Sequence, residues 1–120
     1  MLLLDRSFIS ELMGIIEDIE EYYKELNNGA IKKLVPELQS RSLALNEERK
    51  RKLVKLVGEA DKHIHDFRGD LKNTVQINEA DWERIKLHSS DKTDKKIKIE
   101  FADIKEIKKI LGNACEDKQA

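Results

Sequence analysis

Apolar residues between Phe8 and Leu26 recur with the spacing of an α-helix. If Leu12, Ile19 and Leu26 occupy position a of a heptad, the other apolar residues fill positions d and e. The apolar set is Phe8, Ile9, Leu12, Ile15, Ile16, Ile19, Tyr22, Tyr23 and Leu26. The opposite face is acidic, and an Asn-Asn-Gly sequence ending at Gly29 is typical of a helix C-terminus. We therefore predict a helix with one apolar and one acidic face, in which both tyrosines belong to the core.

A second apolar stripe alternates steps of four and three residues. It consists of Leu53, Val57, Ala60, Ile64, Phe67 and Leu71. Asn46 is a suitable N-cap, and two glutamates follow it in the first turn. A helix over 46–72 would be roughly 40 Å long, which is more than a compact domain of this size needs. We therefore expect part of this stripe to bind another chain.

The segment 30–45 keeps helical spacing, but it contains Pro36. Proline disfavours helix at the preceding residue and removes a hydrogen-bond donor. The segment is either a kinked helix or a turn followed by a short helix that starts at Pro36. The second form is favoured.

The last third of the chain changes period. Apolar and polar residues alternate over 84–88 and over 96–101, with a polar segment between them, which predicts an antiparallel β-hairpin. A two-stranded hairpin is marginal alone, so we expect it to be supported by the helices, by a third strand such as 74–77, or by a partner's strand. A helical turn around Trp82 precedes the hairpin, and a closing helix over 103–111 ends before Gly112.

The predicted fold class is α+β and mainly α: two long antiparallel helices with a short connecting helix, then a β-hairpin and a C-terminal helix. A length of 120 residues fits one domain. We assign residues 1–112 to that domain and 113–120 to a polar tail. Trp82, the single tryptophan, is interpreted as a core residue that joins the two halves.

Charge changes the picture because it is segregated. The chain has 23 Lys and Arg against 24 Asp and Glu, a net charge of -1, which removes the usual argument for a dedicated nucleic-acid or anionic-membrane binder. A basic patch nevertheless marks the start of the long helix: Arg49, Lys50, Arg51, Lys52 and Lys55. Its few phosphate contacts would be salt-sensitive and weak, and no aromatic residues are interleaved for base stacking.

Cys115 is the only cysteine, so no intrachain disulfide can form and a reducing compartment is expected. The apolar run before Asp5 is far shorter than a secretory core or a membrane span. We expect a cytoplasmic protein that binds no membrane. The sequence shows no glycine-rich phosphate loop, paired-carboxylate pocket or nucleophile elbow, so neither a cofactor nor a small-molecule substrate is predicted.

The sequence His65-Asp66-Phe67-Arg68, with Leu71 after it, resembles the H-box of sensor histidine kinases. The resemblance implies a phosphorylated histidine whose acidic neighbour assists proton transfer. It departs from that motif at the next two residues, a glycine and an aspartate, and the second dimerisation helix and the ATP-binding domain are missing. A kinase is thereby excluded, which leaves a histidine phosphotransfer element as the alternative, with His65 as phosphoacceptor.

The same region has the spacing of metal ligands. Glu59, His63 and Asp66 lie at i, i+4 and i+7, and Asp61 and His65 form another i, i+4 pair. Charged helices produce such sets by chance, and only one further histidine stands elsewhere in the chain. No metal site is predicted, and His63 is interpreted as a packed residue beside the apolar stripe.

The function expected from these patterns is a non-catalytic protein–protein interaction or regulatory module. It would self-associate, or bind a protein partner, through residues 53–71 and the edge of the hairpin. The alternatives are the phosphotransfer element and an accessory nucleic-acid-binding subunit that uses the basic patch.

Overall fold

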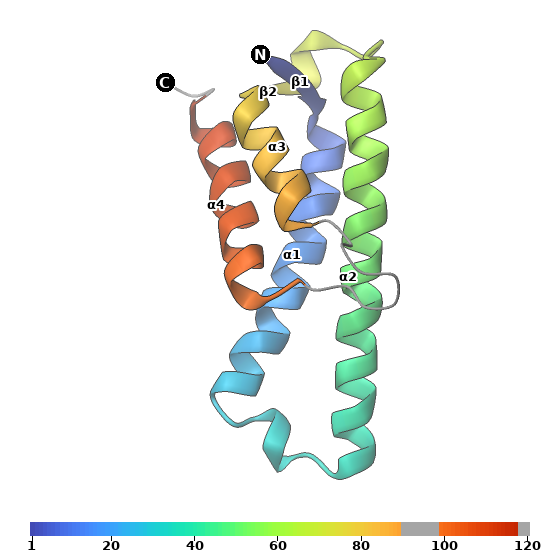
Figure 1. Cartoon of the computed structure of the whole chain (residues 1–120), viewed down its shortest axis with the longest axis vertical. Coiled ribbons are helices and arrows are strands. Elements are labelled where there is room, and N and C mark those ends of the chain that lie inside the picture. The colour runs from blue at the N-terminus through green and yellow to red at the C-terminus, as the bar shows by residue number, and fades with distance from the viewer. Residues whose placement is uncertain (90–98, 118–120) are drawn as a thin grey trace.

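Two long helices form an antiparallel hairpin that organises the rest of the molecule (Figure 1). The structure is a computed structural model, and it describes residues 1–89 and 99–117. In these ranges the protein is mainly helical, with four α-helices and a two-stranded antiparallel sheet. The elements are β1 (Leu2–Asp5), α1 (Arg6–Asn27), the short helix η1 (Ile31–Lys33), α2 (Pro36–His65), the short helix η2 (Leu71–Asn73), β2 (Thr74–Ile77), α3 (Glu79–His88) and α4 (Phe101–Asp117).

The first helix is confirmed, whereas the second differs from the prediction at both ends. The helix that starts at Pro36 is not short but continues as α2 through Asn46, which is a buried residue of the helix and not an N-cap. Proline is well tolerated at the first helical position, where its missing N–H has no partner to lose. α2 ends at His65, before the predicted end at residue 72.

Strand β2 confirms the expected strand over 74–77, but its partner is β1 at the start of the chain. Leu2 pairs with Ile77 and Leu4 with Val75 in an antiparallel register. Side chains alternate across a strand, so these four residues share one face of the sheet. Leu4 and Val75 are almost fully buried on this face, which covers one end of the core.

The predicted β-hairpin is wrong where the structure describes it. Residues 84–88 belong to α3, whose N-cap Asn78 accepts a hydrogen bond from the backbone N–H of Ala80 at 2.8 Å. Ile85 is buried while Leu87 is exposed, so the two do not share a face as strand alternation requires. Phe101 begins α4, and residues 96–98 of the second predicted strand lie outside the described residues.

α4 also extends beyond the predicted domain boundary. It continues through Gly112 to Asp117, and Ala114 and Cys115 pack partly against the core. The predicted polar tail over 113–120 is therefore helical as far as residue 117, and 118–120 lie outside the described residues.

Trp82 joins the halves of the molecule, as predicted. Its side chain is fully buried, and its indole N–H donates to Oδ1 of Asp61 on α2 at 2.8 Å. The prediction for the tyrosines is confirmed for Tyr22, which is buried. Tyr23 is half-buried, and its hydroxyl donates to the carbonyl of Ile99 at 3.2 Å.

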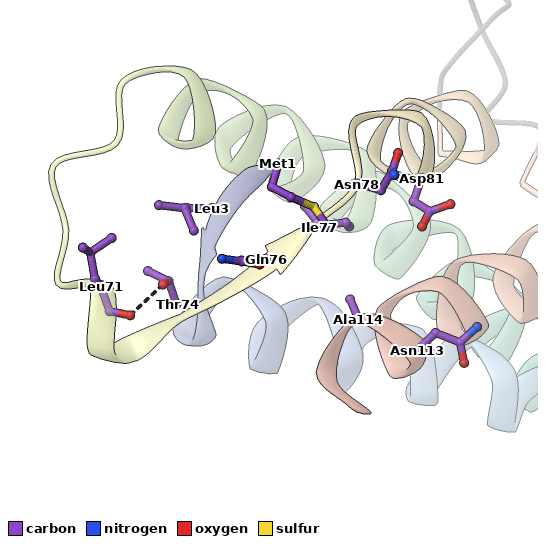
Figure 2. Close-up of a pocket in the computed structure, with 10 residues that line it drawn as sticks. All are labelled: Met1, Leu3, Leu71, Thr74, Gln76, Ile77, Asn78, Asp81, Asn113 and Ala114. Atoms are coloured by element: carbon purple, nitrogen blue, oxygen red, sulfur yellow. Dashed lines mark hydrogen bonds between the residues drawn. The ribbon is translucent and has the colours of Figure 1, made fainter. Parts of the chain in front are cut away.

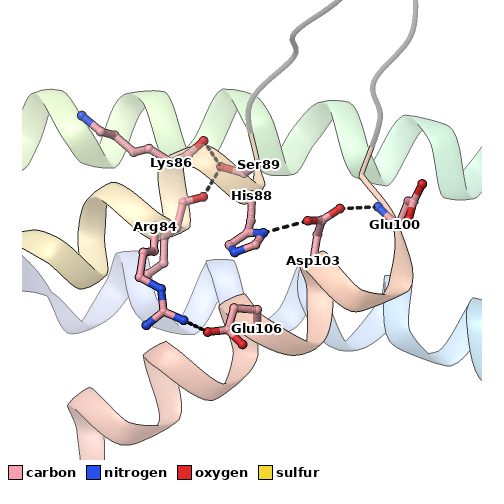
Figure 3. A network of polar contacts seen from close by, with 8 residues as sticks. Arg84, Lys86, His88, Ser89, Glu100, Asp103 and Glu106 are labelled. Carbon is pink, nitrogen blue, oxygen red and sulfur yellow. Dashed lines mark hydrogen bonds and ion pairs between the residues drawn. The ribbon is translucent and has the colours of Figure 1, made fainter.

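A polar network joins α3 to α4 (Figure 3). The Arg84 guanidinium contacts the carboxylate of Glu106, and Nδ1 of His88 lies 2.7 Å from Oδ1 of Asp103. The other oxygen of Asp103 accepts the backbone N–H of Glu100 at 2.8 Å. These contacts hold α3 on α4, which in turn packs on α1.

Candidate partner-binding surface

The α1–α2 hairpin extends well past α3 and α4 (Figure 1). We call the outer part of this hairpin, residues 18–50, the distal end; α4 reaches its inner edge, where Lys108 contacts Glu20 and Phe101 stacks on Tyr23. Its turn is fixed by local contacts: Oδ1 of Asn28 accepts the N–H of Ala30 at 2.9 Å, and Gly29 adopts a positive φ of 84°. Gln39 donates its side-chain amide to the carbonyl of Leu34 at 2.8 Å. The projecting hairpin is therefore a defined structure rather than a loose loop.

Exposed apolar side chains gather at the distal end. The described ranges contain seven large apolar residues that are exposed, and four of them lie within 35–45. These are Val35 (58% exposed), Leu38 (42%), Leu43 (50%) and Leu45 (45%). Single exposed apolar residues are ordinary on protein surfaces, but a local concentration marks an interaction site.

A groove of about 280 Å³ separates α1 from α2 at this end. Tyr22 and Leu45 supply its apolar surface, and Arg49 supplies one positive charge. The α1 side of the groove carries the carboxylates of Asp18, Glu21 and Glu25, and the α2 side is completed by Ser42. The groove therefore has an apolar floor, an acidic wall on α1 and a basic residue on α2.

The charges beside the groove form two lines. Glu11, Asp18 and Glu25 follow one another at seven-residue steps, so they lie on one side of α1, and Glu21 is next to them; we call these four residues the acidic strip. On α2, Leu38, Leu45 and Lys52 are also seven residues apart. Arg41 and Arg49 lie beside this line, and we call Arg41, Arg49 and Lys52 the basic flank.

A polar layer lies beneath this surface, between the two helices. Asn46 is 1% exposed and its Oδ1 has no hydrogen-bond partner among the described residues, while Lys50 is 6% exposed. The Lys50 ammonium lies 3.3 Å from Glu47 and 5.2 Å from the centre of the Tyr23 ring. Burial alone would lower the pKa of Lys50, but Tyr23 and Glu47 outweigh it and the pKa is raised, so this lysine stays charged.

Burial raises the pKa of Tyr22, which lines the groove, so its phenol stays neutral at physiological pH. The groove therefore presents an uncharged phenol ring between the charged side chains of α1 and α2.

The predicted partner-binding stripe lies mostly inside the protein, which corrects the prediction. Leu53, Val57, Ala60 and Ile64 are 0–7% exposed and belong to the core that includes the apolar face of α1. Phe67 is half-buried, with its ring centre 5.5 Å from that of His63. The four buried residues are covered by the same chain and cannot meet a partner.

The basic patch is also divided by the helix. Successive residues turn by about 100°, so a consecutive run cannot present one face. Lys50 is buried, Arg49 is half-buried beside the groove, and Arg51, Lys52 and Lys55 are exposed. The predicted set of five cations does not form one phosphate-binding surface.

His65 is accessible, but the predicted arrangement with Asp66 does not form. His65 is the last residue of α2, its side chain is 66% exposed, and its Nε2 lies 3.5 Å from Oδ1 of Asp61. Asp66 follows the helix end, and its Oδ1 lies 3.5 Å from Nε of Arg68. The two residues therefore do not sit together on a rigid helix, as the resemblance to the H-box requires.

His63 is packed beside the core, as predicted. Its ring lies between those of Phe8 and Phe67, with centres 5.1 and 5.5 Å away, and its Nε2 lies 2.7 Å from Oδ2 of Asp5 without an aligned hydrogen bond. Over residues 1–89 and 99–117, no group of three or more His, Cys, Asp or Glu side chains is arranged to hold a metal ion.

Sequence reasoning missed the exposed apolar residues at the start of α2. The seven-residue spacing of Leu38 and Leu45 can be read from the sequence. That the described chain leaves both side chains exposed is seen only in the structure. The acidic face of the first helix was visible and marks the same region.

No protein-family model matches the chain, and comparisons with curated proteins and with solved structures find no match. None of the described helices is both long enough and apolar enough to span a membrane. Within the described residues, the distal end combines exposed apolar side chains with an acidic strip and a basic flank. It is the candidate partner-binding surface.

Proposed function

We propose that this protein is a non-catalytic interaction module that self-associates through the distal end of its α1–α2 hairpin. The observation that carries the proposal is the exposure of Leu38 and Leu45, which share one face of α2, with exposed Val35 just before that helix. Burying these side chains against a second chain would remove apolar surface from water, which is the main favourable contribution to protein association.

Charge complementarity favours a second copy of the same chain as the partner. A two-fold axis parallel to the hairpin sets α1 of one copy opposite α2 of the other. The acidic strip of each copy then faces the basic flank of the other, with Leu45 and Tyr22 between them. A two-fold axis perpendicular to the helices would place like charges against each other, so the charges also select the orientation.

The resulting assembly is a four-helix bundle at the distal end. In each copy α1 and α2 are an antiparallel pair, and four helices around a shared apolar centre are a common stable arrangement. α4 already packs on α1, so the dimer would extend the covered core along the hairpin.

We also propose that the module works in a reducing compartment such as the cytoplasm. Cys115, the only cysteine, is a half-buried residue of α4 and needs no disulfide for its packing.

Sedimentation equilibrium of the wild type and of Leu45→Asp tests the self-association. The wild type is expected to reach a mass twice the 13.9 kDa of one chain at about 100 µM, a concentration that detects interactions down to weak affinity. Leu45→Asp places a carboxylate beside the acidic wall and is expected to remain monomeric. Leu87→Asp, at an exposed leucine of α3, is the matched control and is expected to dimerise like the wild type.

Circular dichroism confirms that each variant retains its helices. A wild type that stays monomeric at this concentration overturns the proposal. A dimer that survives Leu45→Asp but dissociates with Leu87→Asp would place the interface on α3 and also overturn it.

A further inference from the structure

A second cavity lies at the opposite end of the molecule from the distal end, on the outer face of the β1–β2 sheet (Figures 1 and 2). It has a volume of about 510 Å³ and is formed where the sheet, η2, the start of α3 and the last turns of α4 meet. This volume falls within the range of about 300–1,000 Å³ that is typical of small-molecule sites.

One side of the cavity is apolar. Leu3 stands on the face of the sheet turned away from the core, opposite Gln76 in the register. Leu71 is 66% exposed and Met1 is 76% exposed, and both line the same cavity. A solvent-facing side of an antiparallel sheet is normally polar, so three large apolar side chains here form a surface that an apolar ligand body can cover.

The other side is polar and carries a negative charge. Asn78, Asp81 and Asn113 line it, and no Lys, Arg or His is among the residues of the described chain around the cavity. The Oδ1 of Asn78 already accepts the N–H of Ala80 as the cap of α3, so its amide N–H groups are what it offers to a ligand. The polar side therefore supplies two acceptors, the carboxylate of Asp81 and the side-chain carbonyl of Asn113, while Asn78 adds N–H donors.

The carboxylate of Asp81 is only weakly neutralised. Its Oδ1 lies 3.7 Å from Nη1 of Arg84, and the side chain is 46% exposed. The same guanidinium also contacts Glu106, so its charge is shared between two carboxylates. A cation that enters the cavity meets a carboxylate with room for a second partner.

From this arrangement we infer that the cavity binds a small organic amine: a protonated ammonium group attached to an apolar body. The ammonium group donates to the carboxylate of Asp81 and to the side-chain carbonyl of Asn113, and the body covers Leu3, Leu71 and Met1. Anions such as phosphates and carboxylates are disfavoured because the only charged side chain in the lining is the carboxylate of Asp81. The site does not depend on the proposed self-association, because the two surfaces lie at opposite ends of the molecule.

Three probes of related size test this on the wild-type protein by two-dimensional amide NMR titration. They are 2-phenylethylammonium, the anion 3-phenylpropanoate and ethylammonium, which lacks the apolar body. The first is expected to shift the resonances of residues 3, 71, 76, 78 and 113 saturably. The other two are expected to bind about tenfold more weakly, since each lacks one of the two matched features.

Two variants then test whether the carboxylate of Asp81 binds the ammonium group. Asp81→Asn keeps the shape of the side chain and is expected to weaken 2-phenylethylammonium binding about tenfold, while Asp18→Asn at the distal end leaves it unchanged. Equal binding of the cation and the anion overturns the inference, as do shifts confined to other residues or no saturable shift at all. The comparison of probes needs no variant, so a poorly folded Asp81→Asn does not weaken the test.

Discussion

Asn46 shows how one residue sets the character of the α1–α2 interface. It is buried within α2, and no residue in the described part of the chain hydrogen-bonds to its side-chain oxygen. A buried amide oxygen without a partner costs free energy, because its bonds to water are lost on folding. Together with Lys50 it makes the interface polar near the distal end, where the sequence alone suggested a helix boundary.

Replacing Asn46 with leucine, which has a similar size, is expected to raise the free energy of unfolding by about 1–2 kcal/mol. The substitution removes the unsatisfied oxygen and adds apolar contact with α1. Urea denaturation of Asn46→Leu measures the change, and the exposed Asn27→Leu serves as control. A destabilised Asn46→Leu would show that the amide makes a net stabilising interaction and would contradict this prediction.

Glu20 links α1 to α4 and makes stability depend on acidity. Its Oε1 accepts from Nζ of Lys108 at 2.8 Å and lies 3.5 Å from Nζ of Lys24. The hydrogen bond from Lys108 outweighs burial and lowers the pKa of Glu20 in the folded protein. A lowered pKa contributes stability above the pKa of the unfolded chain, and that contribution is lost as pH falls through the folded value.

Glu20→Gln is therefore expected to cost up to about 1 kcal/mol at neutral pH and to reduce the loss of stability on acidification below about pH 4.5. Urea denaturation at a series of pH values measures both effects, with the exposed Glu48→Gln as control. An unchanged acid profile in Glu20→Gln would mean that the pair with Lys108 does not hold α4 on α1 in solution.

At the scale of elements, the sheet depends on β1, a strand of four residues whose two faces differ. Leu4 is fully buried, and Leu3 faces the outer cavity. Leu4→Ala is expected to cost about 2–5 kcal/mol, while Leu3→Ala should cost less than about 1 kcal/mol. Thermal and urea unfolding of the two variants compare the faces, and equal costs would contradict a strand with this register.

The helices could be predicted from the sequence because their apolar period is long and regular. α1 shows this best, with apolar residues at every a, d and e position from Phe8 to Leu26. The period also identified the apolar face of α2, but it does not say which chain covers that face. Leu53, Val57 and Ile64 are covered by the same chain, because α2 runs back along α1.

The sheet and α3 were harder to predict for a different reason. β1 and β2 are short, and each finds its partner some 70 residues away in the chain, so no local signal joins them. Residues 84–88 alternate like a strand, but five positions are too few to distinguish the period of a strand from that of a helix. In the structure they continue the helix that Asn78 caps. The cavity beside Asp81 exists only once these elements meet.

The whole molecule is longer than its chain length requires. Its extents are 49 × 34 × 21 Å and its radius of gyration is 15.6 Å. A compact chain of this length has a radius of gyration of about 13.6 Å. Much of the difference comes from the outer turns of the distal end, past Tyr23, where two helices run on without α3 and α4 beside them. A second copy at this end would supply the missing neighbours.

The most direct test of the central claim is a charge-exchange experiment on the acidic strip and the basic flank. One variant carries Glu21→Lys with Glu25→Lys, and the other carries Arg41→Glu with Arg49→Glu. Alone, each variant would place like charges against each other at both contacts of the two-fold pair, so each is expected to sediment as a monomer.

In a heterodimer of the two variants, the reversed strip of one chain faces the reversed flank of the other. At the second contact the unchanged flank faces the unchanged strip, so both contacts join opposite charges. The mixture is therefore expected to form a heterodimer of twice the 13.9 kDa chain mass, weakened by added salt, under conditions where neither variant dimerises alone. A mixture that stays monomeric while the wild type forms dimers would contradict the proposed orientation of the two chains.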